Sequence, residues 1–380
     1  MTGYIKTFDS AGLEHYNFIM TTANNITHDV TPKVLNTIQY VNTLDIDEAD
    51  DYFIVKPSNS IDIGTNDPSF CNYGNTDIYS YFAYHLPTYW SATLPPFKLK
   101  SNATEISKLG KTMKRGTQIY GQNSNLTAIK TDWTYCNNIY LMCFSGTPLK
   151  QLPSSWNGLT NLTAMYNGFE SCSQLTTIPD SWVGLDNLIV GTNIFKNCLN
   201  LNAIPSSWNG LGSLTGAPAM FSNCSKITTI PDDWSPLVNF EYAPSMFYGC
   251  TQLTGINSWQ GCKITYTQSM FANCTHLRKV PNSWNGLSSV TNADGIFANC
   301  TELTEIPTDL FTCCPNITQL SAMFSGCISL TSDIKPIMDS GNTKFGSNSN
   351  AYSGAFKSCT GVSSYNTLTS NAAYKKWFDL

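Results

Sequence analysis

The sequence predicts a repeat solenoid, preceded by a mixed α/β cap. The first observation is a phenylalanine that recurs at intervals of 24–27 residues between Phe169 and Phe324. The second is a cysteine three residues after each of these phenylalanines. The third is an apolar residue three positions further on, followed by Ile or Val and in most copies by Pro. Residue types that return in fixed phase over such a length are typical of stacked structural units.

The cysteine position defines the extent of the array. It is occupied by Cys172, Cys198, Cys224, Cys250, Cys274, Cys300 and Cys327. Asn123 takes this position in a degenerate first copy, and Cys359 takes it in a last half-repeat. We therefore expect an N-terminal capping or attachment segment at 1–118, a solenoid at 119–335, and a C-terminal half-repeat and cap at 336–380.

A single unit is too small to fold alone. Five buried side chains contribute about 1.5–3 kcal/mol each, whereas ordering each residue of the unit costs about 1–2 kcal/mol. Stacking against neighbouring units must supply the difference. The Leu-x-x-Ile segment, which is rich in β-branched residues, predicts a short strand that ends at Pro because proline has no N–H. We expect one parallel strand per repeat, with returns made of loop, 3₁₀ turn or short helix.

The repeats resemble a known family. Segments such as MFSNCSKITTIP (220–231) and MFYGCTQLTGI (246–256) are similar to the BspA-like leucine-rich-repeat surface proteins of bacteria, whose units share the Phe-x-x-Cys-x-x-Leu core. The resemblance covers about 119–365 and leaves the N-terminal segment out. It implies a solenoid of the leucine-rich-repeat type and a non-catalytic role in adhesion and host recognition.

Three roles are open for the repeated cysteines. A zinc site needs four ligands that converge on one point, whereas one phase of a solenoid forms a line. Disulfides fit the strand spacing of about 4.7–4.9 Å, but equivalent side chains of stacked strands point the same way. We expect a ladder of buried free thiols, with Asn123 as the alternative that leucine-rich repeats allow. Cys313 is expected to replace a core leucine, and no metal, cofactor or catalytic residue is predicted.

The candidate binding residues lie between the apolar positions of the expected strands. They are Thr176, Thr177, Asn202, Thr228, Thr229, Thr254, Arg278, Lys279, Thr304 and Glu305. Small polar side chains on a regular face suit a carbohydrate or the polar surface of a protein, and a merely solvated face explains them equally. The tryptophans that follow the proline by three residues are interpreted as core packing in preference to a sugar-stacking platform.

The composition narrows the possible partners and locations. Charged residues make up 12% of the chain, and the net charge is −5 without a basic block, so we expect no nucleic-acid partner. The first residues show no signal-peptide pattern, and we expect no membrane insertion. A polar, charge-poor surface favours the outside of a cell or a virion.

The main hypothesis is a recognition protein for a protein or carbohydrate ligand. The alternative is a phage virion structural protein (fibre, decoration or receptor-binding component) that contacts other virion proteins and is anchored by its N-terminal segment. The oligomeric state is left open.

Overall fold

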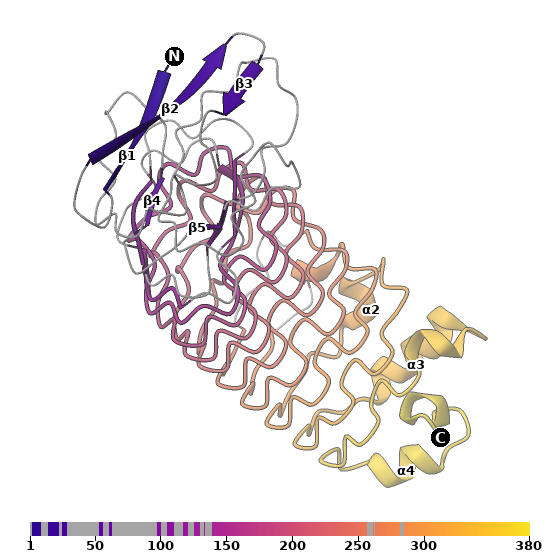
Figure 1. The fold of residues 1–380 in the computed structure, drawn as a ribbon. Helices are drawn as coiled ribbons and strands as arrows, with labels where there is room; N and C mark the ends of the chain where they lie inside the picture. Colours follow the sequence, from indigo (N-terminus) through magenta and orange to yellow (C-terminus); the bar gives the residue numbers. More distant parts are fainter. Residues whose placement is uncertain are drawn as a thin grey trace.

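The computed structural model describes residues 139–256, 263–281 and 285–380, together with 125–129, 133 and 261. In the N-terminal third it describes the backbone of eight strands, β1 to β8. Asn123 and the residues of the segment 1–118 between these strands lie outside the described residues. Figure 1 shows the described repeats as a long stack of similar turns, which ends in the short helices of the C-terminal region.

The strands of the N-terminal part form three sheets. An antiparallel sheet contains β1 (Thr2–Phe8), β2 (Glu14–Thr22) and β3 (Asn25–His28). The other two have the orders β10-β8-β6-β5 and β4-β7-β9. Their strands are β4 (Phe53–Val55), β5 (Ile61–Asp62), β6 (Phe97–Leu99), β7 (Glu105–Leu109), β8 (Thr117–Tyr120), β9 (Ala128–Ile129) and β10 (Ile139–Cys143). Parallel pairs join β6 to β8, β8 to β10 and β7 to β9, so parallel stacking is already present from residue 97 onward.

The described repeats after β10 are joined by isolated parallel bridges. One line of bridges runs through Ala164, Val190, Gly216, Tyr242, Tyr266, Asn292 and Gln319. A second line, in the Leu-x-x-Ile segments, joins Gly255, Lys279 and Glu305. The expected strand in each Leu-x-x-Ile segment is therefore wrong for these repeats. It is found in the first degenerate copy, where β9 occupies that segment.

The backbone before each cysteine forms turns that bond to the next repeat. Asn193 and Asn197 have positive φ values of 55° and 61°, and each later repeat also has two such residues four apart. Left-handed residues interrupt an extended strand, and Asn and Gly adopt them most easily. The N–H of Phe195 donates to Met220 O in the next repeat (2.8 Å), while the N–H of Lys196 closes a turn on Asn193 O. Successive backbone N–H groups thus alternate between a hydrogen bond to the next repeat and a hydrogen bond within the turn.

Two aromatic columns fill the interior. Neighbouring phenylalanine rings stack at 5.5–5.9 Å and 3–18° along Phe144, Phe169, Phe195, Phe221, Phe247, Phe271, Phe297, Phe324 and Phe356. Trp156, Trp182 and Trp208 form a second stack with ring centroids 6.4 Å apart. These tryptophans are fully buried, so the packing interpretation is confirmed for them.

The returns contain short helical turns in two repeats. They are the 3₁₀ turn η1 (Asn285–Leu287) and the helix α2 (Leu310–Cys313), as the expected returns allow. The helix changes the phase of its repeat, so that Cys314 is buried and Cys313 is partly exposed. The expectation that Cys313 takes the core position was therefore wrong by one residue.

The C-terminal region closes the stack. It contains α3 (Lys335–Phe345), η2 (Ser349–Tyr352), α4 (Tyr365–Ser370) and η3 (Lys375–Phe378). Trp377 is fully buried and stacks on Tyr352 at 4.3 Å and on Phe356 at 5.9 Å, at the end of the phenylalanine column. Gly341 makes room for it, because a Cβ at this position would lie 2.4 Å from the indole. Among the described residues, no helix is long and apolar enough to cross a membrane.

Candidate functional site

The structure places the repeated cysteines inside the solenoid as a row of equivalent thiols. Each Sγ donates a hydrogen bond to the phenylalanine carbonyl of the preceding repeat, at 3.0–3.3 Å. The donors are Cys172, Cys198, Cys224, Cys250, Cys274, Cys300, Cys327 and Cys359, and all are buried. The thiol therefore acts as a hydrogen-bond donor as well as a small apolar group.

The shared carbonyl explains why a donor suits this position. Phe195 O accepts the N–H of Cys198 from its own repeat at 3.0 Å and the Sγ–H of Cys224 from the next repeat at 3.0 Å. A carbonyl oxygen has two lone pairs, so both bonds can form together. The thiol satisfies a buried acceptor that an alanine would leave with one partner.

The thiols have the chemistry of buried structural groups. Burial raises the pKa of Cys172 to about 11 and the pKa of Cys224 and Cys274 to about 12, because the interior disfavours a thiolate. Nucleophilic and metal-bound cysteines need the thiolate instead. The eight cysteines of the row are free thiols. No three His, Cys, Asp or Glu side chains of the described residues converge as a metal site requires.

The ten predicted binding residues are all exposed, and we call them the polar face. Backbone bonds hold them in successive repeats: Asn202 N–H donates to Thr176 O at 3.2 Å, and Arg278 N–H donates to Thr254 O at 3.1 Å. The remaining members are Thr177, Thr228, Thr229, Lys279, Thr304 and Glu305. The structure therefore brings the predicted residues together, and their role in binding stays a prediction.

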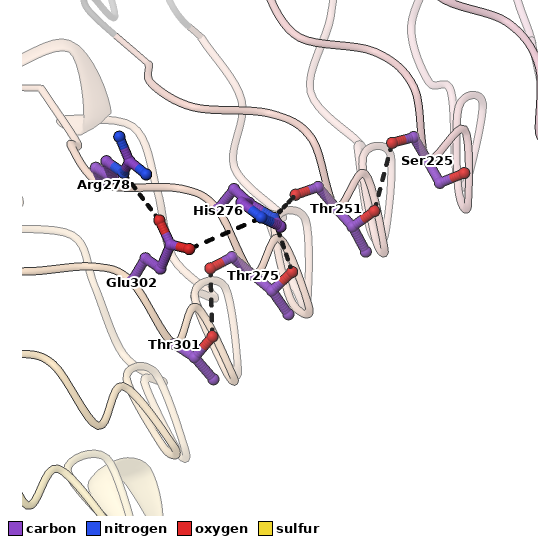
Figure 2. A network of polar contacts seen from close by, with 7 residues as sticks. All are labelled: Ser225, Thr251, Thr275, His276, Arg278, Thr301 and Glu302. Carbon is purple, nitrogen blue, oxygen red and sulfur yellow. Dashed lines mark hydrogen bonds and ion pairs between the residues drawn. The ribbon is translucent and has the colours of Figure 1, made fainter.

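A charged network lies at the polar face (Figure 2). Arg278 Nε donates to Glu302 Oε2 at 2.8 Å, and His276 Nε2 lies 3.8 Å from Glu302 Oε1. His276 Nδ1 lies 2.7 Å from Thr251 O. Because a carbonyl only accepts, Nδ1 carries the proton and Nε2 faces the carboxylate. His276 and Glu302 were not predicted as site residues, since their position two after the cysteine varies from repeat to repeat.

A row of hydroxyl groups borders this network. Thr251 Oγ1 donates to Ser225 O at 3.4 Å, and Thr301 Oγ1 donates to Thr275 O at 3.3 Å (Figure 2). The hydroxyls continue the bonding between repeats on the surface. Thr275 Oγ1 also lies 3.4 Å from His276 Nδ1, so the arrangement offers hydrogen-bonding groups and one charge cluster.

These features define the class of the protein as a solenoid of the leucine-rich-repeat type. The chain belongs to the family described as "Mycoplasma protein of unknown function, DUF285", whose model matches residues 117–234 and 241–367. A search of curated proteins found no match to the chain.

Solved structures with a similar repeat architecture were found. The leucine-rich repeat domain of the type III effector XopL is 18% identical, with a TM-score of 0.35 over 53% of this chain and 67% of that one. TLR13 in complex with ssRNA13 is 15% identical, with a TM-score of 0.34 over 61% of this chain and 39% of that one. A leucine-rich-repeat protein of Leptospira interrogans is 12% identical, with a TM-score of 0.20 over 63% and 70% of the two chains. At these sequence identities and TM-scores, the similarity is not evidence of a shared function.

Proposed function

We propose that the protein is a non-catalytic recognition module whose solenoid binds a protein or carbohydrate ligand through the polar face. The observation that carries the proposal is the contrast along one row of this face. Arg278 has the same backbone position as Thr228, Thr254 and Thr304 but differs from these threonines in size and charge. A position that the fold leaves free can be used to select a partner.

The surface of the array supports a site of action at the outside of a cell or a virion. Thr, Ser and Asn are the commonest residue types at its described exposed positions, and charged residues make up 12% of the chain. The resemblance of the repeats to BspA-like surface proteins of bacteria supports adhesion in particular. Fractionation that finds the native protein in the soluble interior of its cell, and in no surface or particle fraction, would contradict this location.

The binding proposal is tested with the labelled full-length chain on intact cells and on a glycan array. The variant Thr228→Arg/Thr254→Arg puts two bulky side chains on the polar face, and we expect at least about tenfold weaker binding. The matched control is Val183→Arg, because Val183 is 52% exposed and lies outside this face. The proposal fails if wild-type chain binds neither cells nor glycans, or if the two-site variant binds as well as the control.

A further inference from the structure

A second surface of the solenoid differs in chemistry from the polar face. Tyr242 and Tyr266 occupy adjacent repeats on the longer line of bridges, and each is 47% exposed. Their ring centroids lie 5.8 Å apart with the planes tilted by 55°. Tyr242 leans over Gly216, where an added Cβ would lie 3.6 Å from Cδ1 of its ring. The absence of a side chain at Gly216 therefore leaves this ring uncrowded on the N-terminal side.

Within the segments that carry these rings, all charged side chains are acidic, and the neighbouring Lys263 lies just before the segment of Tyr266 and donates to Val238 O at 3.3 Å. We define the tyrosine stripe as the segments 189–192, 215–218, 241–244, 265–268, 291–294 and 318–321, all of which the structure describes. Its charged residues are Glu241 and Asp294, and it contains no Lys, Arg or His. The polar face, by contrast, contains Arg278 and Lys279. The stripe thus combines exposed aromatic rings with unbalanced negative charge.

Asp294 in particular lacks a counter-ion within the described part of the chain. Its Oδ1 accepts the N–H of Ser321 at 2.7 Å, and its Oδ2 accepts Nδ2 of Asn292 at 3.3 Å. The side chain is partly buried, and this burial raises the pKa of its carboxyl group. A cation supplied from outside would offset this cost. Glu241, beside Tyr242, is exposed and forms no ion pair with a described residue.

We propose that the tyrosine stripe binds a cationic segment of a partner protein. A lysine or arginine side chain of that segment stacks on the ring of Tyr242 or Tyr266, and its charge lies close to Glu241 or Asp294. Cations are attracted to the faces of tyrosine rings, and arginine makes such contacts most often. Tyrosine is also enriched among the residues that dominate protein interfaces. Because the two rings are tilted by 55°, they do not form the single flat platform on which a sugar would stack.

This inference rests on the protein being a recognition module but concerns a different face, so the two proposals can fail separately. The test uses fluorescence anisotropy of the full-length chain with a labelled twelve-residue probe of Arg, Gly and Ser that carries four arginines. A second probe has Gln in place of each Arg. Measurements in low and physiological salt separate long-range attraction from contact, because salt screens exposed charges.

We expect Tyr242→Ala/Tyr266→Ala to weaken binding of the arginine probe about tenfold. Asp294→Asn should weaken it about threefold. Asp232→Asn makes the same change at an exposed position outside both the stripe and the polar face, and it is the matched control, with a change below about 1.5-fold. Gln268→Lys puts a cation into the stripe at an exposed position and should abolish binding. It tests the proposal independently if the tyrosine variant does not fold. The unfolding temperature of each variant is measured to verify that it is folded.

Three results would overturn the proposal. One is binding within twofold of wild type in the folded tyrosine variant or in Gln268→Lys. Another is an equal loss in Asp232→Asn and Asp294→Asn, which would indicate non-specific attraction to an acidic protein. The last is tyrosine-dependent binding of the glutamine probe at the same strength, which would show that the stripe takes a neutral ligand. None of these results depends on the variants that test the polar face.

Discussion

The cysteine row inside the solenoid and the row Thr228, Thr254, Arg278 and Thr304 outside it run along the same repeats. Inside, each thiol makes the same bond to a phenylalanine carbonyl, at 3.0–3.3 Å. Outside, threonine changes to arginine while the backbone bond between repeats is kept, as from Arg278 N–H to Thr254 O. The stack depends on interior side chains that are the same in every repeat. The exterior side chains can differ from one repeat to the next.

The largest effect on the free energy of unfolding is expected at alkaline pH, where the interior thiols behave differently from the exterior side chains. Burial raises the pKa of the interior thiols, to about 12 for Cys224 and Cys274. Such groups stabilise the fold fully below the unfolded pKa of about 8.5, and this contribution is lost as the pH rises toward the folded value. Each thiol that ionises on unfolding then lowers the free energy of unfolding by about 1.4 kcal/mol per pH unit.

Urea unfolding between pH 8 and pH 10 measures this effect. We expect a steep fall in the free energy of unfolding, and a shallower fall in Cys224→Ala/Cys274→Ala because two titrating groups are gone. A free energy that stays constant over this range would contradict the assignment of neutral buried thiols.

The second effect concerns the phenylalanine column. Phe247 stacks on Phe221 at 5.6 Å and on Phe271 at 5.5 Å and is fully buried. Phe247→Ala should lower the free energy of unfolding by about 3–5 kcal/mol, since it opens a cavity between two rings. Thr229→Ala, on the exposed side of the neighbouring repeat, should change it by less than about 0.5 kcal/mol. Equal costs in the two variants would remove the distinction between interior and exterior.

A smaller effect tests the donor role of the thiol. Cys224→Ala removes the bond to Phe195 O and leaves a small cavity, and it should cost about 1–2 kcal/mol. Cys224→Ser keeps a donor within reach of the same carbonyl, so we expect a lower cost than for alanine. If serine is the more destabilising of the two, the cysteine acts mainly as an apolar group.

The smallest effect is expected at the charged network. Glu302→Gln removes the ion pair with Arg278, whose side chain is 63% exposed. Exposed pairs contribute about 0–1 kcal/mol, so the free energy of unfolding should fall by less than about 1 kcal/mol. A loss comparable to that of Phe247→Ala would mean that this part of the exterior also holds the stack together.

The sequence predicted those features that recur in every repeat. The phase of Phe, Cys and Leu identified the solenoid and its core, because each unit must present the same groups to its neighbours. The strands expected in the Leu-x-x-Ile segments were wrong for the later repeats, because these segments are joined at most by isolated bridges such as Gly255 to Lys279. The apolar pattern also did not reveal the left-handed residues before each cysteine, such as Asn193 and Asn197. The pairing of His276 with Glu302 could not be predicted either, because it joins variable positions of two repeats.

The indole of Trp377 has a consequence for how proteins of this kind can change in length. It covers the ring of Phe356, so the aromatic column ends on a side chain that is not part of a further unit. Each inner unit presents the same two surfaces to its neighbours, and its contacts do not depend on how many units precede it. Duplication of a whole unit would therefore lengthen the protein without altering the contacts at its C-terminal end. Loss of residues 371–380 would instead expose an aromatic ring and so promote association with another chain.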